Sequence, residues 1–263
     1  MSNADRDATI FPKVRYLLPS LIFLGLLLYG VLWWVSPYIS ENVYWLAYYS
    51  IDLAYVAIVL TILKVRKINL FQSKAGVRSA LKTCVLMFLA MIFAFGSIML
   101  FSLLLPEIYE NEELDVLVKF DPLYIGIAGF LSMVILAPFW EEIAFRGLIL
   151  NRWVHKWSIT RAIILSSLLF ALFHPLDIIG AFIFGLILAV QYLNTRNIVI
   201  VIIGHAFYNG ILFLFFLAYY LFLSNETVEE PTTRGILIFG LILTTISFPF
   251  LLYWLKKNWP KAT

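Results

Sequence analysis

The sequence has few charged residues and a single cysteine. Only 13% of its 263 residues are Asp, Glu, Lys or Arg, and 62% are hydrophobic. Soluble domains have about 25% charged residues, so this composition excludes an ordinary soluble protein and indicates a polytopic membrane protein. Cys84 alone excludes an intramolecular disulfide and a cysteine-rich metal site. No stretch is polar enough for a separate soluble domain, and we expect one membrane domain over residues 1–263.

Several signatures of enzymes and pumps are also missing. The sequence contains no His-Glu-x-x-His zinc motif, no Gly-x-Ser-x-Gly elbow and no glycine-rich phosphate loop. Asp52 has no second aspartate within a span, which argues against a membrane aspartyl dyad. Zincins, serine hydrolases and ATP-driven pumps are therefore unsupported, and we expect no nucleic-acid partner.

Long apolar runs divide the chain into about eight predicted spans, which makes the expected fold an all-α transmembrane bundle. A span needs about 20 mostly apolar residues to cross the hydrocarbon core. The predicted spans are Tyr16–Val35, Val43–Leu63, Thr83–Leu105, Pro122–Trp140, Arg161–His174, Ile178–Tyr192, Ile198–Leu223 and Gly235–Leu255. The fifth and sixth are short, so these two helices, joined around a Pro-Leu-Asp turn, could stop before the far side.

The charges between the spans predict the orientation of the chain. Lys64–Lys82 is basic, whereas Pro106–Asp121 and Ser224–Pro231 are acidic. Because cytoplasmic loops are enriched in Lys and Arg, we place the basic segment inside and the acidic segments outside. Both termini are then cytoplasmic, and we expect a prokaryotic plasma membrane. The fourth span returns to the cytoplasm near Trp140, and the next connection is marked by Arg146, Arg152, Lys156 and Arg161.

A group of polar side chains interrupts the later apolar runs. Its members are Glu141, Glu142, His174, His205 and Asn209. A charge at the centre of a bilayer costs about 2.5–3.5 kcal/mol on insertion scales, so these residues are candidates for function. Residues four apart share a helix face, which predicts that His205 and Asn209 point the same way and that Glu142 pairs with Arg146.

These residue types suit the hydrolysis of an amide. A carboxylate shielded from bulk water is a useful general base. Neutral imidazoles and a carboxamide can position a water molecule or donate hydrogen bonds to the oxyanion of a tetrahedral intermediate. Each residue also has a plainer interpretation. The glutamates could be a solvated interfacial pair, His174 could cap a carbonyl, and His205 and Asn209 could join helices by hydrogen bonds.

Three motifs follow one another along these spans. They are Glu141-Glu142-Ile-Ala-Phe-Arg146, Phe170-Ala-Leu-Phe-His174 and His205-Ala-Phe-Tyr-Asn209. They resemble the Glu-Glu-x-x-x-Arg, Phe-x-x-x-His and His-x-x-x-Asn motifs of the CPBP family, the CAAX proteases and bacteriocin-processing enzymes also called Abi. The resemblance covers about residues 120–215, the expected catalytic core. It implies an eight-helix intramembrane endopeptidase similar to type II CAAX prenyl proteases.

The resemblance also implies a role for each motif residue. Glu141 would activate the attacking water, His174 would help to bind it, and His205 and Asn209 would stabilise the oxyanion. The supporting residues would be Glu142, Arg146 and Phe170. A glutamate-dependent mechanism without a metal is favoured, so no cofactor is expected. If zinc is bound, its ligands would be Glu141, His174 and His205.

The depth of the polar residues adds a geometric expectation. By helical rise, His174 lies about 20 Å beyond Arg161, whereas Glu141 lies only about 7 Å from Arg146. The depths agree if the fifth helix tilts or begins above the membrane, or if Arg146 is inside the bundle and paired with Glu142. We predict the second arrangement, with a site open to the cytoplasm. A shared site requires Glu141 to lie within about 8 Å of a motif histidine, because one water must bridge them.

The expected partners are membrane lipids and a membrane-associated protein or peptide, prenylated or not. CAAX ends, bacteriocin leaders and membrane-anchored regulators all stay open as substrates. A rival interpretation is a non-catalytic bacteriocin-immunity or scaffold protein with a relict site. A third is a small transporter that uses Glu141 and Asp52 to carry protons.

Overall fold

The computed structural model describes residues 11–70, 76–104, 122–222 and 232–261, and all the regular elements within them are helices. The α-helices are α2 (Val14–Val35), α3 (Glu41–Arg66), α4 (Val77–Leu104), α7 (Pro122–Phe130), α8 (Ala137–Glu142), α9 (Asn151–Lys156), α10 (Ile159–Leu172), α11 (Ile178–Thr195), α12 (Ile198–Phe222) and α13 (Thr233–Asn258). Shorter segments are the 3₁₀ turns η1 (Ser36–Tyr38) and η4 (Pro175–Asp177) and the π-helical segments η2 (Leu131–Leu136) and η3 (Ile143–Leu150). The predicted all-α class is confirmed.

Seven helical segments of the described residues are long and apolar enough to cross a membrane. They are Val14–Tyr38, Val43–Arg66, Val77–Leu104, Gly126–Lys156, Pro175–Thr195, Ile198–Ala218 and Thr233–Asn258. The remaining apolar helix, α10, has only 14 residues and rises about 21 Å, less than the roughly 30 Å of a hydrocarbon core. The chain is therefore an integral multi-pass membrane protein. Its described residues hold seven long apolar helices and one short one, close to the predicted eight spans.

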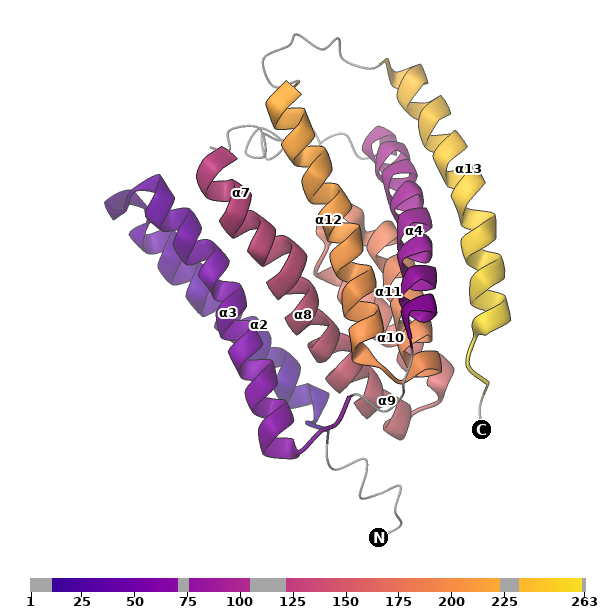
Figure 1. Cartoon of the computed structure of the whole chain (residues 1–263), viewed down its shortest axis with the longest axis horizontal. Coiled ribbons are helices and arrows are strands. Elements are labelled where there is room, and N and C mark those ends of the chain that lie inside the picture. The colour runs from indigo at the N-terminus through magenta and orange to yellow at the C-terminus, as the bar shows by residue number, and fades with distance from the viewer. Residues whose placement is uncertain (1–10, 71–75, 105–121, 223–231, 262–263) are drawn as a thin grey trace.

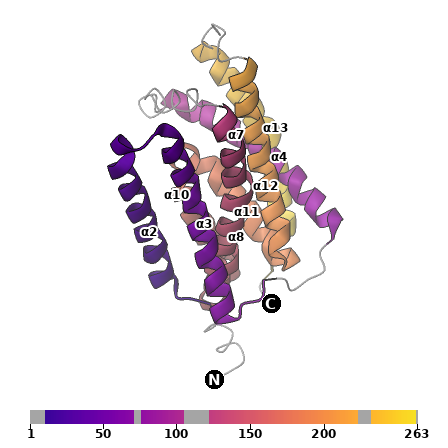
Figure 2. The same ribbon diagram turned by 60° about the vertical axis from the view of Figure 1, so that its left-hand side comes forward.

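The bundle is built around α11. Twelve of its 18 residues are buried, and it packs against α4, α10, α12 and α13. Helices α4 and α13 lie side by side at one edge, and α2 and α3 form a hairpin at the opposite edge (Figures 1 and 2). Of the two helices in this hairpin, α3 is the one that packs against the central part of the bundle. It contacts α7, η2 and α8.

Small residues bring the central helices close together. A Cβ atom at Gly185 of α11 would lie 3.0 Å from the Cβ of Ser167 on α10. A Cβ atom at Gly96 of α4 would lie 3.0 Å from the carbonyl oxygen of Gly240 on α13. Membrane helices associate through such close backbone contacts because lipid offers no hydrophobic driving force between them.

The predicted end of the fourth span at Trp140 is wrong. The chain stays helical from Pro122 to Lys156, through α7, η2, α8, η3 and α9. Arg146 therefore does not mark a cytoplasmic connection; it is only 2% exposed and lies inside the bundle, as the depth argument predicted. The helix continues because the residues after Glu142 form the most buried stretch of the column: every residue from Ile143 to Leu150 is buried.

Two other boundaries differ from the sequence predictions. Helix α4 begins at Val77, so Arg78 and Lys82 belong to a helix and not to the basic connection. The sixth helix extends to Thr195 and is long enough to span. The predicted turn between the short helices is confirmed as η4. The acidic segments Pro106–Asp121 and Ser224–Pro231, on which the predicted orientation depends, lie outside the described residues.

Candidate active site

The two glutamates lie where the long helical column changes its hydrogen-bonding pattern. Glu141 and Glu142 end α8, which has the π-helical segment η2 before it and η3 after it. A π-helical turn holds an extra residue and turns the following side chains to a new direction, and such turns are frequent at functional sites. The column thus directs two successive carboxylates into the bundle, which a regular helix in lipid would rarely do.

Glu142 lies at the centre of a buried ion-pair network. Its Oε1 accepts a hydrogen bond of 2.7 Å from Nη1 of Arg146, as the spacing of four predicted. The same oxygen lies 2.8 Å from Nδ1 of His205, on α12. All three side chains are at least 96% buried. A buried carboxylate needs such partners, because removing charges from water costs several kcal/mol each.

Glu141 lies on the other side of the same imidazole. Its Oε2 is 3.9 Å from Nε2 of His205, too far for a direct hydrogen bond. This oxygen is buried and has no hydrogen-bond partner among the described residues. The distance is within the 8 Å that a shared site requires, so Glu141 and His205 are brought together. Their catalytic roles stay predictions.

Phe170 supports three of the polar motif residues. Its ring is 1% exposed and stacks on the ring of His174, with centroids 4.5 Å apart. The guanidinium carbon of Arg146 lies over the Phe170 ring, 4.5 Å from its centroid. The His205 ring packs edge-on against Phe170, with ring centroids 6.0 Å apart. An aromatic face attracts a cation, most strongly where water is excluded. One phenylalanine therefore links all three motifs.

His174 is held at the end of α10. Its Nδ1 lies 3.0 Å from the carbonyl oxygen of Phe170, and Pro175 begins η4 directly after it. An Nδ1–H that donates to this carbonyl leaves Nε2 as the hydrogen-bond acceptor of a neutral ring. The structure therefore fixes both the direction and the tautomer of this imidazole.

Asn209 contacts η2. Its Nδ2 donates a hydrogen bond of 2.8 Å to the carbonyl oxygen of Met133. The amide keeps a second N–H and a carbonyl oxygen for other partners. Among the hydrogen bonds and ion pairs of the described residues, none joins His174 or Asn209 to either glutamate. Glu141 and Glu142 therefore both lie beside His205. His174 is linked to this group through the Phe170 ring, and Asn209 is bonded to η2.

Asp52 connects the N-terminal hairpin to this site. Its carboxylate accepts hydrogen bonds from the hydroxyl of Ser132 in η2 and, at 2.9 Å, from Nε1 of Trp140 in α8. The Trp140 ring also stacks on Tyr55 of α3, with centroids 4.4 Å apart. The sequence identified Asp52 as an isolated acid but not its partners, which lie 80 and 88 positions away.

The residues expected as zinc ligands do not form a metal site in the part of the chain that is described. No three His, Cys, Asp or Glu side chains there lie close enough together to hold a metal ion. Glu141 faces His205, whereas none of the contacts among the described residues joins His174 to either of these side chains. The observed donor set does not fit the three protein ligands of a catalytic zinc, and we derive no step through a metal.

A comparison with known families agrees with the three motifs. Residues 123–211 match the family model described as Type II CAAX prenyl endopeptidase Rce1-like. The match covers about a third of the chain and includes every motif residue from Glu141 to Asn209. No curated protein and no solved structure matches the chain. The resemblance identified from the motifs is confirmed, and at the level of the family it supports a CAAX-type membrane protease.

Proposed function

We propose, from the premise that residues 123–211 are a domain of this protease family, that the chain is an intramembrane endopeptidase in which Glu141 activates water. Its substrate would be a membrane-associated protein or peptide of the CAAX type. The observation that carries the proposal is the Oε2 atom of Glu141, which is buried, has no hydrogen-bond partner in the described part of the chain and lies 3.9 Å from Nε2 of His205. A buried carboxylate oxygen without a partner is costly, and a reacting water would satisfy it.

Glu141 and His174 are the proposed acceptors for that water. A water molecule can donate one proton to the Glu141 carboxylate and its other hydrogen bond to the free Nε2 of His174. The water oxygen then attacks the scissile carbonyl carbon, a carbon–oxygen bond forms, and the proton moves to Glu141. When the carbon–nitrogen bond breaks, the protonated Glu141 returns this proton to the leaving amine.

His205 and Asn209 are the proposed donors to the oxyanion. Glu142 holds Nδ1 of His205 at 2.8 Å, which turns Nε2 toward Glu141, where the carbonyl would lie. Because Nδ1–H donates to Glu142, Nε2 can donate to the oxyanion only while the ring carries a proton on both nitrogens. The Glu142 carboxylate would stabilise that positive charge, as the aspartate does for the histidine of a serine-protease triad. Asn209, fixed through Met133, would add its second N–H. Oxyanion donors are worth about 10²–10³ in rate each.

A substitution at Glu141 tests the proposal. Glu141→Gln keeps the size of the side chain and removes the base, so we expect loss of cleavage of a prenylated CAAX peptide by the purified protein in lipid nanodiscs.

The membrane proteomes of cells with the wild type and with this variant would be compared at equal expression. Proteins that keep their uncleaved ends only in the variant are the substrates. Equal cleavage and equal proteomes would instead favour the non-catalytic immunity or scaffold protein.

A further inference from the structure

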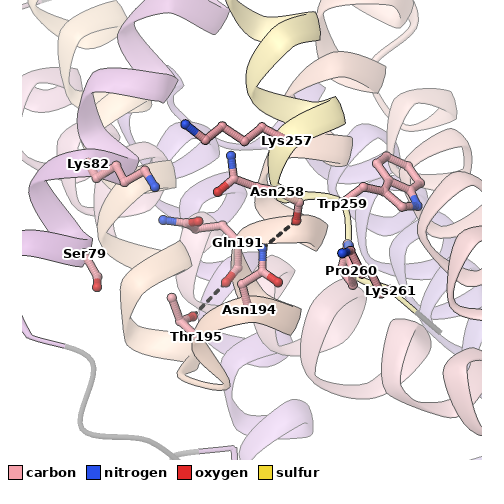
Figure 3. Close-up of a pocket in the computed structure, with 10 residues that line it drawn as sticks. All are labelled: Ser79, Lys82, Gln191, Asn194, Thr195, Lys257, Asn258, Trp259, Pro260 and Lys261. Carbon is pink, nitrogen blue, oxygen red and sulfur yellow. Dashed lines mark hydrogen bonds between the residues drawn. The ribbon is translucent and has the colours of Figure 1, made fainter. Parts of the chain in front are cut away.

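A second polar site lies at the C-terminal end of α11, apart from the two glutamates. A pocket of about 400 Å³ lies between the first turns of α4, the last turns of α11 and the end of α13 (Figure 3). From the described geometry we propose that this pocket binds the phosphate headgroup of an anionic phospholipid. Its lining residues are Ser79, Lys82, Gln191, Asn194, Thr195, Lys257, Asn258, Trp259, Pro260 and Lys261.

The charge of the pocket is entirely positive. Lys82, Lys257 and Lys261 line it from two helices and the segment after α13, and none of its lining residues is acidic. In the described ranges, none of these lysines forms an ion pair with a carboxylate. Three positive charges around one pocket repel one another, and a bound phosphate would relieve this repulsion.

The polar wall between the lysines is held in place by hydrogen bonds. Gln191, only 4% exposed, donates from Nε2 to the Thr83 hydroxyl at 2.7 Å. Asn194 donates from Nδ2 to the carbonyl oxygen of Asn258 at 2.8 Å, which ties the end of α11 to the end of α13 (Figure 3). The polar wall of the pocket is thus fixed by contacts among three helices, and the exposed lysines stand around it.

The surroundings of the pocket favour a lipid over a soluble anion. Trp259 lines the pocket, and Tyr253 and Trp254 lie just before it on α13, where the ammonium groups of Lys257 and Lys82 contact their rings. Tryptophan and tyrosine gather at the depth of lipid headgroups. Basic pockets between membrane helices on the cytoplasmic side bind anionic headgroups, and the predicted orientation places this end of the bundle there.

The pocket is separate from the glutamates but shares a helix with them. Gly185 of α11 accepts a hydrogen bond from Arg146 at 3.4 Å, and Gln191 follows six positions later, about 9 Å along the same helix. Lys82 lies on α4, Lys257 lies on α13 and Lys261 follows α13, and none of these segments carries a motif residue. Binding of a lipid here therefore does not depend on the proposed peptidase activity.

The test compares two double variants that remove the same charge. Lys82→Gln with Lys257→Gln removes two pocket lysines, whereas Lys64→Gln with Lys256→Gln removes two lysines that do not line the pocket. Each protein is titrated in detergent with phosphatidylglycerol and, separately, with phosphatidylcholine, and bound lipid is counted by native mass spectrometry. We expect the pocket variant to bind phosphatidylglycerol at least about tenfold more weakly than the wild type, and the control to bind it nearly normally.

Three results would overturn the proposal. Equal weakening in both double variants would mean that general surface charge attracts the lipid. Equal retention of phosphatidylcholine and phosphatidylglycerol by the wild type would mean that the phosphate charge is not recognised. Displacement of the lipid by millimolar inorganic phosphate or glycerol phosphate would identify a site for a soluble anion. An unchanged elution volume of the pocket variant in size-exclusion chromatography shows that it is folded.

Discussion

The carboxylate of Asp52 accepts a hydrogen bond of 2.9 Å from the indole of Trp140, the residue directly before Glu141. Its second oxygen accepts from Ser132, the residue directly before Met133, whose carbonyl holds Asn209. One aspartate on α3 therefore holds η2 and α8 in place, beside the proposed oxyanion donor Asn209 and the proposed base Glu141. The N-terminal hairpin, which carries no motif, is tied to the site at this residue.

Loss of these two bonds is expected to lower the rate of cleavage more than the stability. Asp52→Ala should reduce kcat about 100-fold, because a displacement of about 1 Å at a catalytic group costs that much. Asp52→Asn keeps one carbonyl acceptor, so its loss should be smaller, about tenfold. The check is kcat on a fluorogenic CAAX peptide.

Ser50→Ala is the matched control for Asp52, because its hydroxyl bonds only within α3. A fall of kcat in this control equal to that in Asp52→Asn would contradict the positioning role.

Substitution of the two adjacent glutamates should change the stability of the protein by very different amounts. Glu142→Ala leaves the buried Arg146 without its carboxylate, and removing one partner of a buried ion pair costs about 3–5 kcal/mol. Glu141→Gln removes a charge that has no hydrogen-bonded partner, so its stability should change by less than about 1 kcal/mol. Thermal unfolding of both variants in the same detergent measures the difference. A melting temperature lowered equally in both would contradict the separate roles.

Phe170 is expected to affect activity through the residues that it supports. Phe170→Leu keeps an apolar side chain but removes the ring that contacts Arg146, His174 and His205. We expect kcat to fall at least about tenfold, with a loss of stability of about 1–2 kcal/mol.

Phe173→Leu is a suitable control for Phe170, because this ring is 48% exposed and contacts Phe145 but not the histidines. Equal effects of the two substitutions would show that Phe170 acts only by filling space.

Activity is expected to persist without a metal. Incubation with EDTA or 1,10-phenanthroline, followed by removal of the chelator, should leave cleavage of the CAAX peptide within about twofold of its starting rate. The experiment contradicts the proposed mechanism if the chelator abolishes activity and zinc alone restores it.

The close approach of α10 and α11 should be sensitive to side-chain size. A Cβ at Gly185 would lie 3.1 Å from the Cα of Ser167, so Gly185→Val must push the helices apart. We expect a loss of about 1–3 kcal/mol and a drop in activity, because Arg146 bonds the Gly185 carbonyl. Gly30→Val is the control, since no atom lies within 4 Å of a Cβ there. The two melting temperatures in detergent give the comparison.

Local spacing predicted the parts of the site that depend on one helix. The pairing of Glu142 with Arg146 follows from the helical repeat, and the depth argument correctly placed Arg146 inside the bundle. Hydropathy predicted the number of apolar helices but not where the fourth one ends. In hydropathy alone Glu141 and Arg146 look like interfacial charges, whereas in the fold the helix continues past them because Ile143–Leu150 is buried in the bundle.

Contacts between distant segments could not be predicted in the same way. Asp52 meets Trp140 through the packing of α3 on α8, and no periodicity within either segment indicates this. The π-helical segments η2 and η3 also escaped prediction, because a single extra residue in a turn leaves the apolar pattern almost unchanged. The carbonyl partner of Asn209 depends on one of them.

The short helix α10 has a consequence for the membrane itself. Because it rises only about 21 Å, the bundle presents a local hydrophobic thickness about a third below that of the bilayer. Lipids meet such a mismatch by thinning, at a cost of fractions of a kcal/mol per Å. Such thinning would bring the membrane surface closer to His174, which follows the end of α10. A bilayer of longer acyl chains is expected to slow the supply of water to Glu141, so that acyl-chain length becomes a regulator of hydrolysis.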